Sequence, residues 1–136
     1  VKEKTYKYII NMGDVDPIKE DYVYNYGYKL DIKVMKKASK YLIGKHSYKV
    51  FVSGERDNYN SQIFKVKFDK ENNFLTITFV GKSFYRYMVR NLVGMMIEVG
   101  RGKDSISKVK EMLETSESMP GFTAPANGLY LEKIEY

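Results

Sequence analysis

The chain of 136 residues contains no cysteine and one histidine, and it carries a formal net charge of +6. The missing cysteines exclude disulfides, thiolate catalysis and cysteine-based metal sites, and His46 alone cannot form a multi-histidine metal site, so we expect no metal centre. No apolar run is long enough to cross a bilayer, and the excess of positive charge favours an anionic partner, with nucleic acid ahead of a membrane surface.

A β-strand is the first predicted element, within residues 4–12. Tyr6, Tyr8 and Ile10 recur there at every second position, which is typical of a half-buried strand. Proline and glycine interrupt the following residues, 13–29, so we predict a long loop ordered by its own tyrosines.

A helix is predicted next, from Asp31, which can cap its first turn, to Gly44, which can end it. Its apolar residues recur at intervals of three and four, as on one buried helix face. The opposite face is rich in lysine, and two interpretations stay open: a solvated surface, or a contact with a phosphate backbone. The lysines concerned include Lys33, Lys37 and Lys40.

Residues 61–81 contain two alternating β segments separated by a polar turn at residues 71–73, which predicts a β-hairpin. A helix is predicted in residues 104–115, which begin with a capping signature, and a last strand in residues 128–136. This order of elements predicts an α+β fold in which helices pack on one face of an antiparallel sheet. We expect a single cytoplasmic domain over residues 1–136.

The segment from Phe84 to Val99 predicts a helix with apolar residues on every side, as in a helix buried all round. Arg86 and Arg90 are exceptions, and their spacing of four places them on one stripe. A buried guanidinium needs an acidic partner, because an unpaired buried charge costs on the order of several kcal/mol. An internal carboxylate such as Glu98, or a phosphate or carboxylate from elsewhere, could be that partner.

Gly94 lies on the same predicted stripe as the two arginines. A glycine inside a helix costs about 1 kcal/mol relative to alanine. Its presence predicts that another backbone or a ligand approaches this stripe closely.

Several ungapped motifs occur along the chain: K-x-Y-x-Y near the start, then YLIGKHSY, GKSFYRYMVRNLVGMMIEVGRG and TAPANGLYLEKIEY. Together they resemble the C-terminal part of the tRNA pseudouridine synthase A family. The resemblance is specific, because the motifs keep their order and are spread over nearly the whole chain.

The resemblance implies the C-terminal domain of an isomerase that converts uridine to pseudouridine in the anticodon stem-loop of tRNA, without metal or organic cofactor. In the family the nucleophile is an aspartate in a motif of the Arg-Thr-Asp-Ala-Gly-Val-His-Ala type, upstream of the K-x-Y strand. This chain has no such motif, and its own aspartates lie in predicted loops, caps and turns. We therefore expect it to resemble the C-terminal half only and to be inactive by itself.

The matching positions carry implied roles. Arg90 would pair with the absent aspartate and hold it ionised and oriented. Tyr6 would pack against the flipped target base, with an ordinary strand tyrosine as the alternative. Three residues of the closing motif would form the pocket wall, with plain core packing as the alternative: Gly128, Leu129 and Tyr130.

The resemblance also implies two partners, tRNA and a second copy of the full-length protein in a homodimer. Arg86 joins the three lysines above as a candidate RNA contact. Many family members carry an arginine just before the first hairpin strand, where this chain has Ser61. A basic contact to RNA is therefore expected to be weaker, or to move to Arg56 or Lys65.

Two further hypotheses remain open from the sequence. One is a noncatalytic RNA-binding or dimerisation module of the same fold, and the other is a basic scaffold protein unrelated to tRNA. An aspartate-containing motif upstream of Val1 in the encoding gene would support the enzyme over the module.

Overall fold

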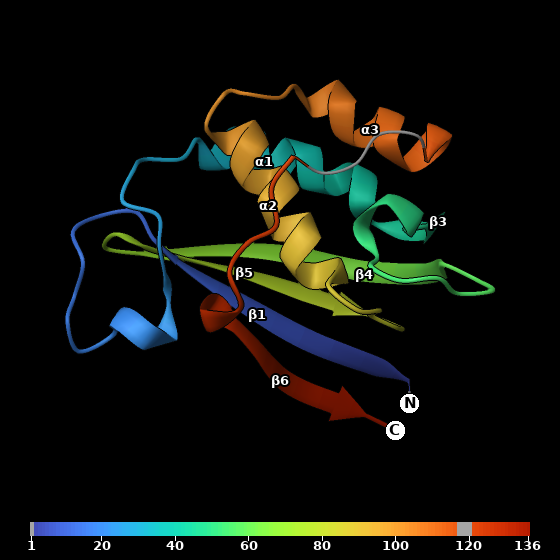
Figure 1. Ribbon diagram of the computed structural model, residues 1–136, viewed down its shortest axis with the longest axis horizontal. Coiled ribbons are helices and arrows are strands. Elements are labelled where there is room, and N and C mark those ends of the chain that lie inside the picture. The colour runs from blue at the N-terminus through green and yellow to red at the C-terminus, as the bar shows by residue number, and fades with distance from the viewer. Residues whose placement is uncertain (1, 117–120) are drawn as a thin grey trace.

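A mainly antiparallel sheet forms one layer of the molecule. The computed structural model describes residues 2–116 and 121–136. Within them the sheet order is β2-β1-β5-β4-β3, with β6 also paired to β1 (Figure 1). All strand pairs are antiparallel except the short pair of β1 with β2. The strands are β1 (Glu3–Asn11), β2 (Tyr24–Asn25), β3 (Gly44–Ser47), β4 (Asn60–Glu71), β5 (Phe74–Gly81) and β6 (Leu129–Glu135).

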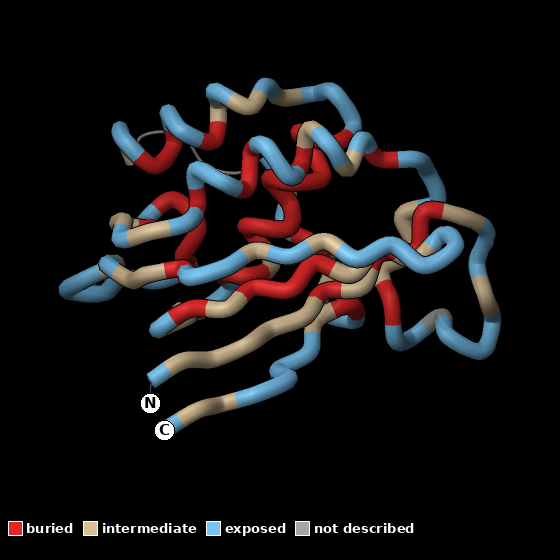
Figure 2. The backbone as a smooth tube through the Cα atoms, turned by 180° about the vertical axis from the view of Figure 1, so that it is seen from behind, coloured by how far each residue is buried: buried red, intermediate tan, exposed pale blue. Residues whose placement is uncertain are grey.

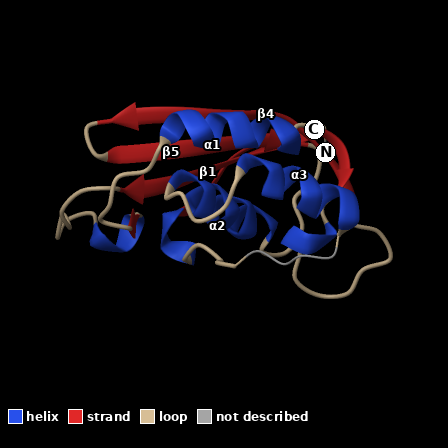
Figure 3. Ribbon diagram, turned by 90° about the horizontal axis from the view of Figure 1, so that it is seen from above, coloured by secondary structure: helices blue, strands red, loops and turns tan. Residues whose placement is uncertain are grey.

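Helices α1 (Ile32–Ser39), α2 (Met88–Gly100) and α3 (Ile106–Thr115) all cover the same face of this sheet (Figures 1 and 3). The predicted α+β class, with helices on one face, is confirmed. None of the helices in the described residues is both long enough and apolar enough to span a membrane.

The core lies between the sheet and the helices, where the buried segments gather (Figure 2). Tyr8 and Ile10 of β1 face it, as their alternation predicts, and neither side chain is accessible to solvent. Helix α2 forms the centre of this core, since every one of its residues except Arg90 is buried. The prediction of a helix buried nearly all round is confirmed for this segment.

The predicted hairpin is confirmed: β4 and β5 are joined at Asn72, whose positive φ of 55° makes the tight turn. The end predicted for the first helix was wrong. Helix α1 stops at Ser39, and a 3-10 turn covers Lys40–Leu42. Gly44 then begins β3, a strand that sequence analysis missed, and pairs with Ile63 of β4.

Candidate active-site pocket

The segment between β5 and α2 differs from its prediction. Helix α2 begins at Met88 rather than Phe84, because Tyr87 has a left-handed backbone (φ 61°) that a continuing helix cannot include. Arg86 therefore precedes the helix, and its predicted shared stripe with Arg90 was wrong. The guanidinium carbons of Arg86 and Arg90 nevertheless both contact the Tyr87 ring, at 5.2 and 4.7 Å from its centre, respectively.

Arg90 is held by the main chain of a distant segment. Its Nε donates to the carbonyl oxygen of Ala124 at 2.7 Å, and the Ala124 amide donates back to the Arg90 carbonyl at 3.1 Å. Glu98, one of the internal partners considered for it, pairs instead with Arg101 and Lys103. Within the described residues, no carboxylate forms an ion pair with Arg90.

The close approach predicted at Gly94 is confirmed, and the neighbour is a backbone. A Cβ added at Gly94 would lie 1.9 Å from the carbonyl oxygen of Phe122. Beside it, Thr123 donates its hydroxyl to the Asn91 side chain, which donates in turn to the Phe51 carbonyl. Segment 122–124 thus packs against residues 90, 91 and 94 of α2.

A pocket of about 370 Å³ opens beside the first turn of α2. Tyr6 of β1 lies on one side and contacts Phe84 edge to face, with ring centres 5.2 Å apart. The structure brings together in this pocket four residues singled out in the sequence, none of them acidic: Tyr6, Arg86, Arg90 and Leu129.

Two other residues of the predicted pocket wall lie elsewhere. Gly128 is buried, and a Cβ there would lie 2.8 Å from both the Ile9 carbonyl oxygen and the Tyr8 ring, so close packing requires glycine. Tyr130 pairs with Lys7 and lines a separate hollow of about 510 Å³ on the sheet, where its hydroxyl donates to the Tyr22 carbonyl. Neither residue lines the pocket of Tyr6 and Arg90.

The lysines proposed from the first helix are also apart from this pocket. They are exposed on α1 and the 3-10 turn that follows, and none of them lines it: Lys33, Lys37 and Lys40. Helices α1 and α2 lie side by side over the sheet (Figure 3).

Sequence reasoning missed Tyr87 as a member of the site. Its hydroxyl has a lowered pKa, because the neighbouring Arg86 guanidinium hydrogen-bonds to it and the charges of Arg86 and Arg90 favour the phenolate. Residues 83–90, SFYRYMVR, are rich in aromatic and basic side chains, and this was the signal in the sequence. A continuous helix would point these side chains in different directions. The pocket therefore has a positive potential and aromatic walls.

The protein has an α+β fold with a cationic pocket at the start of the central helix α2. Because its walls are aromatic, this pocket is suited to an anionic ligand that carries aromatic rings. The chain belongs to the tRNA pseudouridine synthase family, since the family model with that description matches residues 38–136. This membership argues against a scaffold unrelated to tRNA.

Curated relatives agree with the family. The chain is 35% identical over 136 residues to a tRNA pseudouridine synthase A of Thermosipho melanesiensis, covering 98% of this chain and 56% of the relative. It is 39% identical over 139 residues to the protein of that name from Finegoldia magna, covering 99% of this chain and 57% of the relative. The chain thus spans about half the length of the curated relatives it matches.

Proposed function

We propose that this chain forms the C-terminal half of a tRNA pseudouridine synthase that isomerises uridine in the anticodon stem-loop of tRNA. The observation that carries the proposal is the pocket that Tyr6 and Arg90 both line, in which no acidic residue of the described part of the chain takes part. Such a pocket supplies a base-stacking surface and a cation, and it lacks only the carboxylate nucleophile that the rest of the protein would contribute. Neither a metal nor an organic cofactor is needed for these roles.

Arg90 would orient and ionise that carboxylate. Its bond to the Ala124 carbonyl fixes the guanidinium plane, and a fixed guanidinium can hold a carboxylate in a bidentate pair. An opposite charge within about 4–6 Å lowers the pKa of a carboxylate by about 1–3 units, which keeps it ionised as a nucleophile. The aromatic ring of Tyr87 beside both arginines would reduce their exposure to water and strengthen that attraction.

Tyr6 would receive the nucleotide taken out of the tRNA stem. Its edge-to-face contact with Phe84 limits the orientations of the ring before the base arrives. Stacking on a protein ring contributes about 1–3 kcal/mol per base, which offsets part of the stacking lost on flipping. The Tyr6 hydroxyl would also take part in proton transfer, and Leu129 would form the apolar wall.

We further propose that the full-length protein acts in the cytoplasm as a homodimer, as the family resemblance implies. A noncatalytic RNA-binding or dimerisation module remains the second candidate. The same absence of an acidic group from the pocket favours it, if the protein supplies no aspartate from elsewhere.

The test is to replace Arg90 in the complete protein and measure pseudouridine formation on unmodified tRNA. Arg90→Ala is expected to lower kcat by about 100-fold or more, in the range seen when a single stabilising donor is removed. Arg90→Lys should recover little, because the planar fork is lost. The acidic limb of the pH–rate profile should move to higher pH by about 1–3 units in the residual activity.

Lys70→Ala is the matched control, since Lys70 is an exposed cation on β4 outside the pocket. Thermal unfolding of each variant separates lost chemistry from lost fold. Near-normal turnover in Arg90→Ala would remove Arg90 from the site, and a wild-type protein that binds tRNA without modifying it would favour the noncatalytic module.

A further inference from the structure

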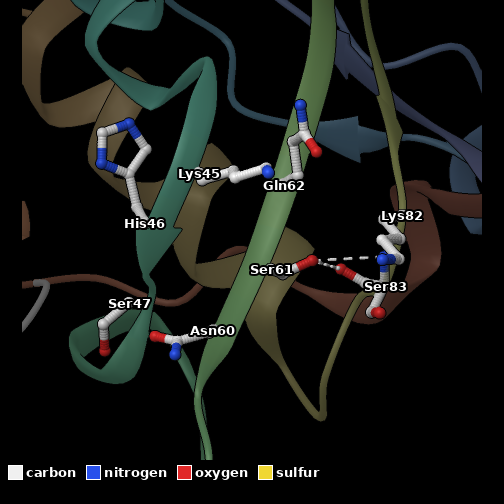
Figure 4. A pocket seen from close by; sticks show the side chains of 8 residues that line it. All are labelled: Lys45, His46, Ser47, Asn60, Ser61, Gln62, Lys82 and Ser83. Atoms are coloured by element: carbon white, nitrogen blue, oxygen red, sulfur yellow. Dashed lines mark hydrogen bonds between the residues drawn. The ribbon is translucent and has the colours of Figure 1, made fainter.

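A larger hollow of about 650 Å³, separate from the candidate active-site pocket and from the hollow at Tyr130, lies where β3 pairs with the start of β4, beside the segment that leaves β5 (Figure 4). Its lining is polar or basic, and none of its lining residues is acidic. Lys45 comes from β3 and Lys82 from the segment after β5, and the two lie on either side of β4 (Figure 4).

The backbone fixes the spacing of these two lysines. Lys45 pairs with Gln62 across the β3–β4 ladder, and the Lys82 amide donates to the Gln62 carbonyl at 2.8 Å. Two interstrand steps separate their backbones, which corresponds to roughly 10 Å. Between the two lysines, Ser61 joins β4 to the segment after β5. Its Oγ donates to the Ser83 carbonyl at 2.7 Å and accepts from the Ser83 amide at 3.2 Å.

This hollow is linked to the candidate active-site pocket through shared lining residues. A smaller hollow, of about 390 Å³, shares Lys82 with the larger hollow and Arg86 with the pocket, and it adds Lys4 and Arg56. Arg56 is itself positioned by Tyr85, with its guanidinium carbon 4.3 Å from the ring centre. We call the resulting row of cations the basic strip: Lys4, Lys45, Arg56, Lys82, Arg86 and Arg90.

Within the described residues, the cations of the basic strip have no carboxylate partners, a property that they share with the exposed lysines of α1. No member forms an ion pair with a carboxylate in the described part of the chain, whereas Lys7, Lys67 and Lys110 each do. Among the described residues, no acidic side chain lines any of these three hollows, although Glu55 and Asp57 line a separate hollow with Arg56. Adjacent cations repel one another, so an uncompensated row of this kind is best satisfied by a polyanion.

We propose that the basic strip binds successive phosphates of the tRNA strand that flanks the target nucleotide, with Lys45 and Lys82 as its outer anchor. This inference rests on the proposed function, because the strip leads into the pocket assigned to the base. Phosphate contacts set the position of a nucleic acid on a protein, so the strip fixes which nucleotide reaches Tyr6.

The strip also bears on the position where the chain departs from its family. Ser61, where the resemblance implies an arginine, lines the larger hollow beside Lys82. On this proposal, Lys45 of β3 and Lys82, just after β5, would supply the cation implied at this position. Of the two substitutes expected from the sequence, Arg56 belongs to the strip, and Lys65 lines none of the three hollows.

The test is the double variant Lys45→Gln/Lys82→Gln in the complete protein, with tRNA affinity measured at several salt concentrations. We expect the Kd to rise about tenfold at moderate salt, and the slope of log K against log salt to fall by about 1.4–1.8, or 0.7–0.9 for each lost phosphate contact. The KM for tRNA should rise by a larger factor than kcat falls.

The matched control is Lys70→Gln/Lys110→Gln, which removes the same charge from exposed positions outside the strip. It should keep the wild-type Kd and slope. If both double variants bind tRNA as the wild type does, while the wild type modifies tRNA, the basic strip is wrong and the proposed function stands. If tRNA binding depends on Lys45 and Lys82 but the wild type has no activity, the proposed function fails and the strip survives. An equal loss of binding to polyglutamate would overturn the assignment to RNA.

Discussion

Gly94→Ala tests the packing that positions Arg90. At an ordinary position inside a helix, replacing glycine by alanine stabilises the helix by about 1 kcal/mol. Here the new methyl group would lie 1.9 Å from the Phe122 carbonyl oxygen, so the segment 122–124 has to move away from α2. Overpacking of this kind costs about 1–3 kcal/mol, and sometimes more.

The movement would also weaken hydrogen bonds that join the segment to α2. Both bonds between Arg90 and Ala124 are affected, together with the bond from Thr123 to Asn91. Each contributes about 0.5–1.5 kcal/mol. After subtracting the gain in helix propensity, we expect the free energy of unfolding to fall by about 2–4 kcal/mol.

Urea unfolding of the 136-residue chain, followed by circular dichroism, measures this loss as a lower midpoint at an unchanged slope. Gly121→Ala is the matched control, since no atom of the described residues lies within contact distance of a Cβ there. It should unfold close to the wild type. The reasoning is refuted if Gly94→Ala is as stable as Gly121→Ala.

Three other predictions concern activity and pH. The isolated chain should fold but form no pseudouridine on unmodified tRNA, and turnover by the purified chain would contradict this. In the complete protein, Tyr6→Leu should lose far more activity than Tyr6→Phe if the ring stacks on the base, whereas equal loss in both indicates proton transfer; wild-type turnover in Tyr6→Leu would leave Tyr6 as a strand residue. Burial raises the pKa of Tyr8 and Tyr48 in the folded chain. Their contribution to stability is therefore complete below the unfolded pKa of about 10 and is lost as pH rises above it, by about 1.4 kcal/mol per pH unit for each residue. Unfolding titrations from pH 8 to 11 check this, and Tyr8→Phe should make the alkaline decline shallower.

Much of the fold could be predicted because its long elements carry strong periodic signals. The alternation in β1, β4 and β5 and the all-round apolar character of α2 reflect burial directly. Strand β3 was missed because four residues, Gly44–Ser47, are too short for a period to show, and their place depends on pairing with β4. The early end of α1 has the same origin, since the chain must leave the helix to place β3 at the edge of the sheet beside β4.

The site was predictable only in part. Tyr6 and Arg90 could be found from their motifs, but the stripe shared by Arg86 and Arg90 rested on a helix that began too early. No local pattern predicts a left-handed tyrosine at position 87, because a positive φ is uncommon for residues other than glycine and is most enriched at Asn, Asp and His. The basic strip combines residues from β1, β3, the loop before β4, the segment after β5 and α2, so it exists only once the sheet and helix α2 have formed.

The main-chain anchor of Arg90 has a consequence for how the protein tolerates genetic variation. Its partner atom is the carbonyl oxygen of residue 124, which every amino acid possesses. Point mutation at Ala124 therefore cannot delete the acceptor, although the lack of space around this buried methyl group limits which residues fit. The position most sensitive to mutation is instead Gly94, where even the methyl group of alanine would displace segment 122–124. In a saturation library, position 94 should consequently be less permissive than position 124, even though Gly94 has no side chain and lies one helical turn away from the arginine it protects.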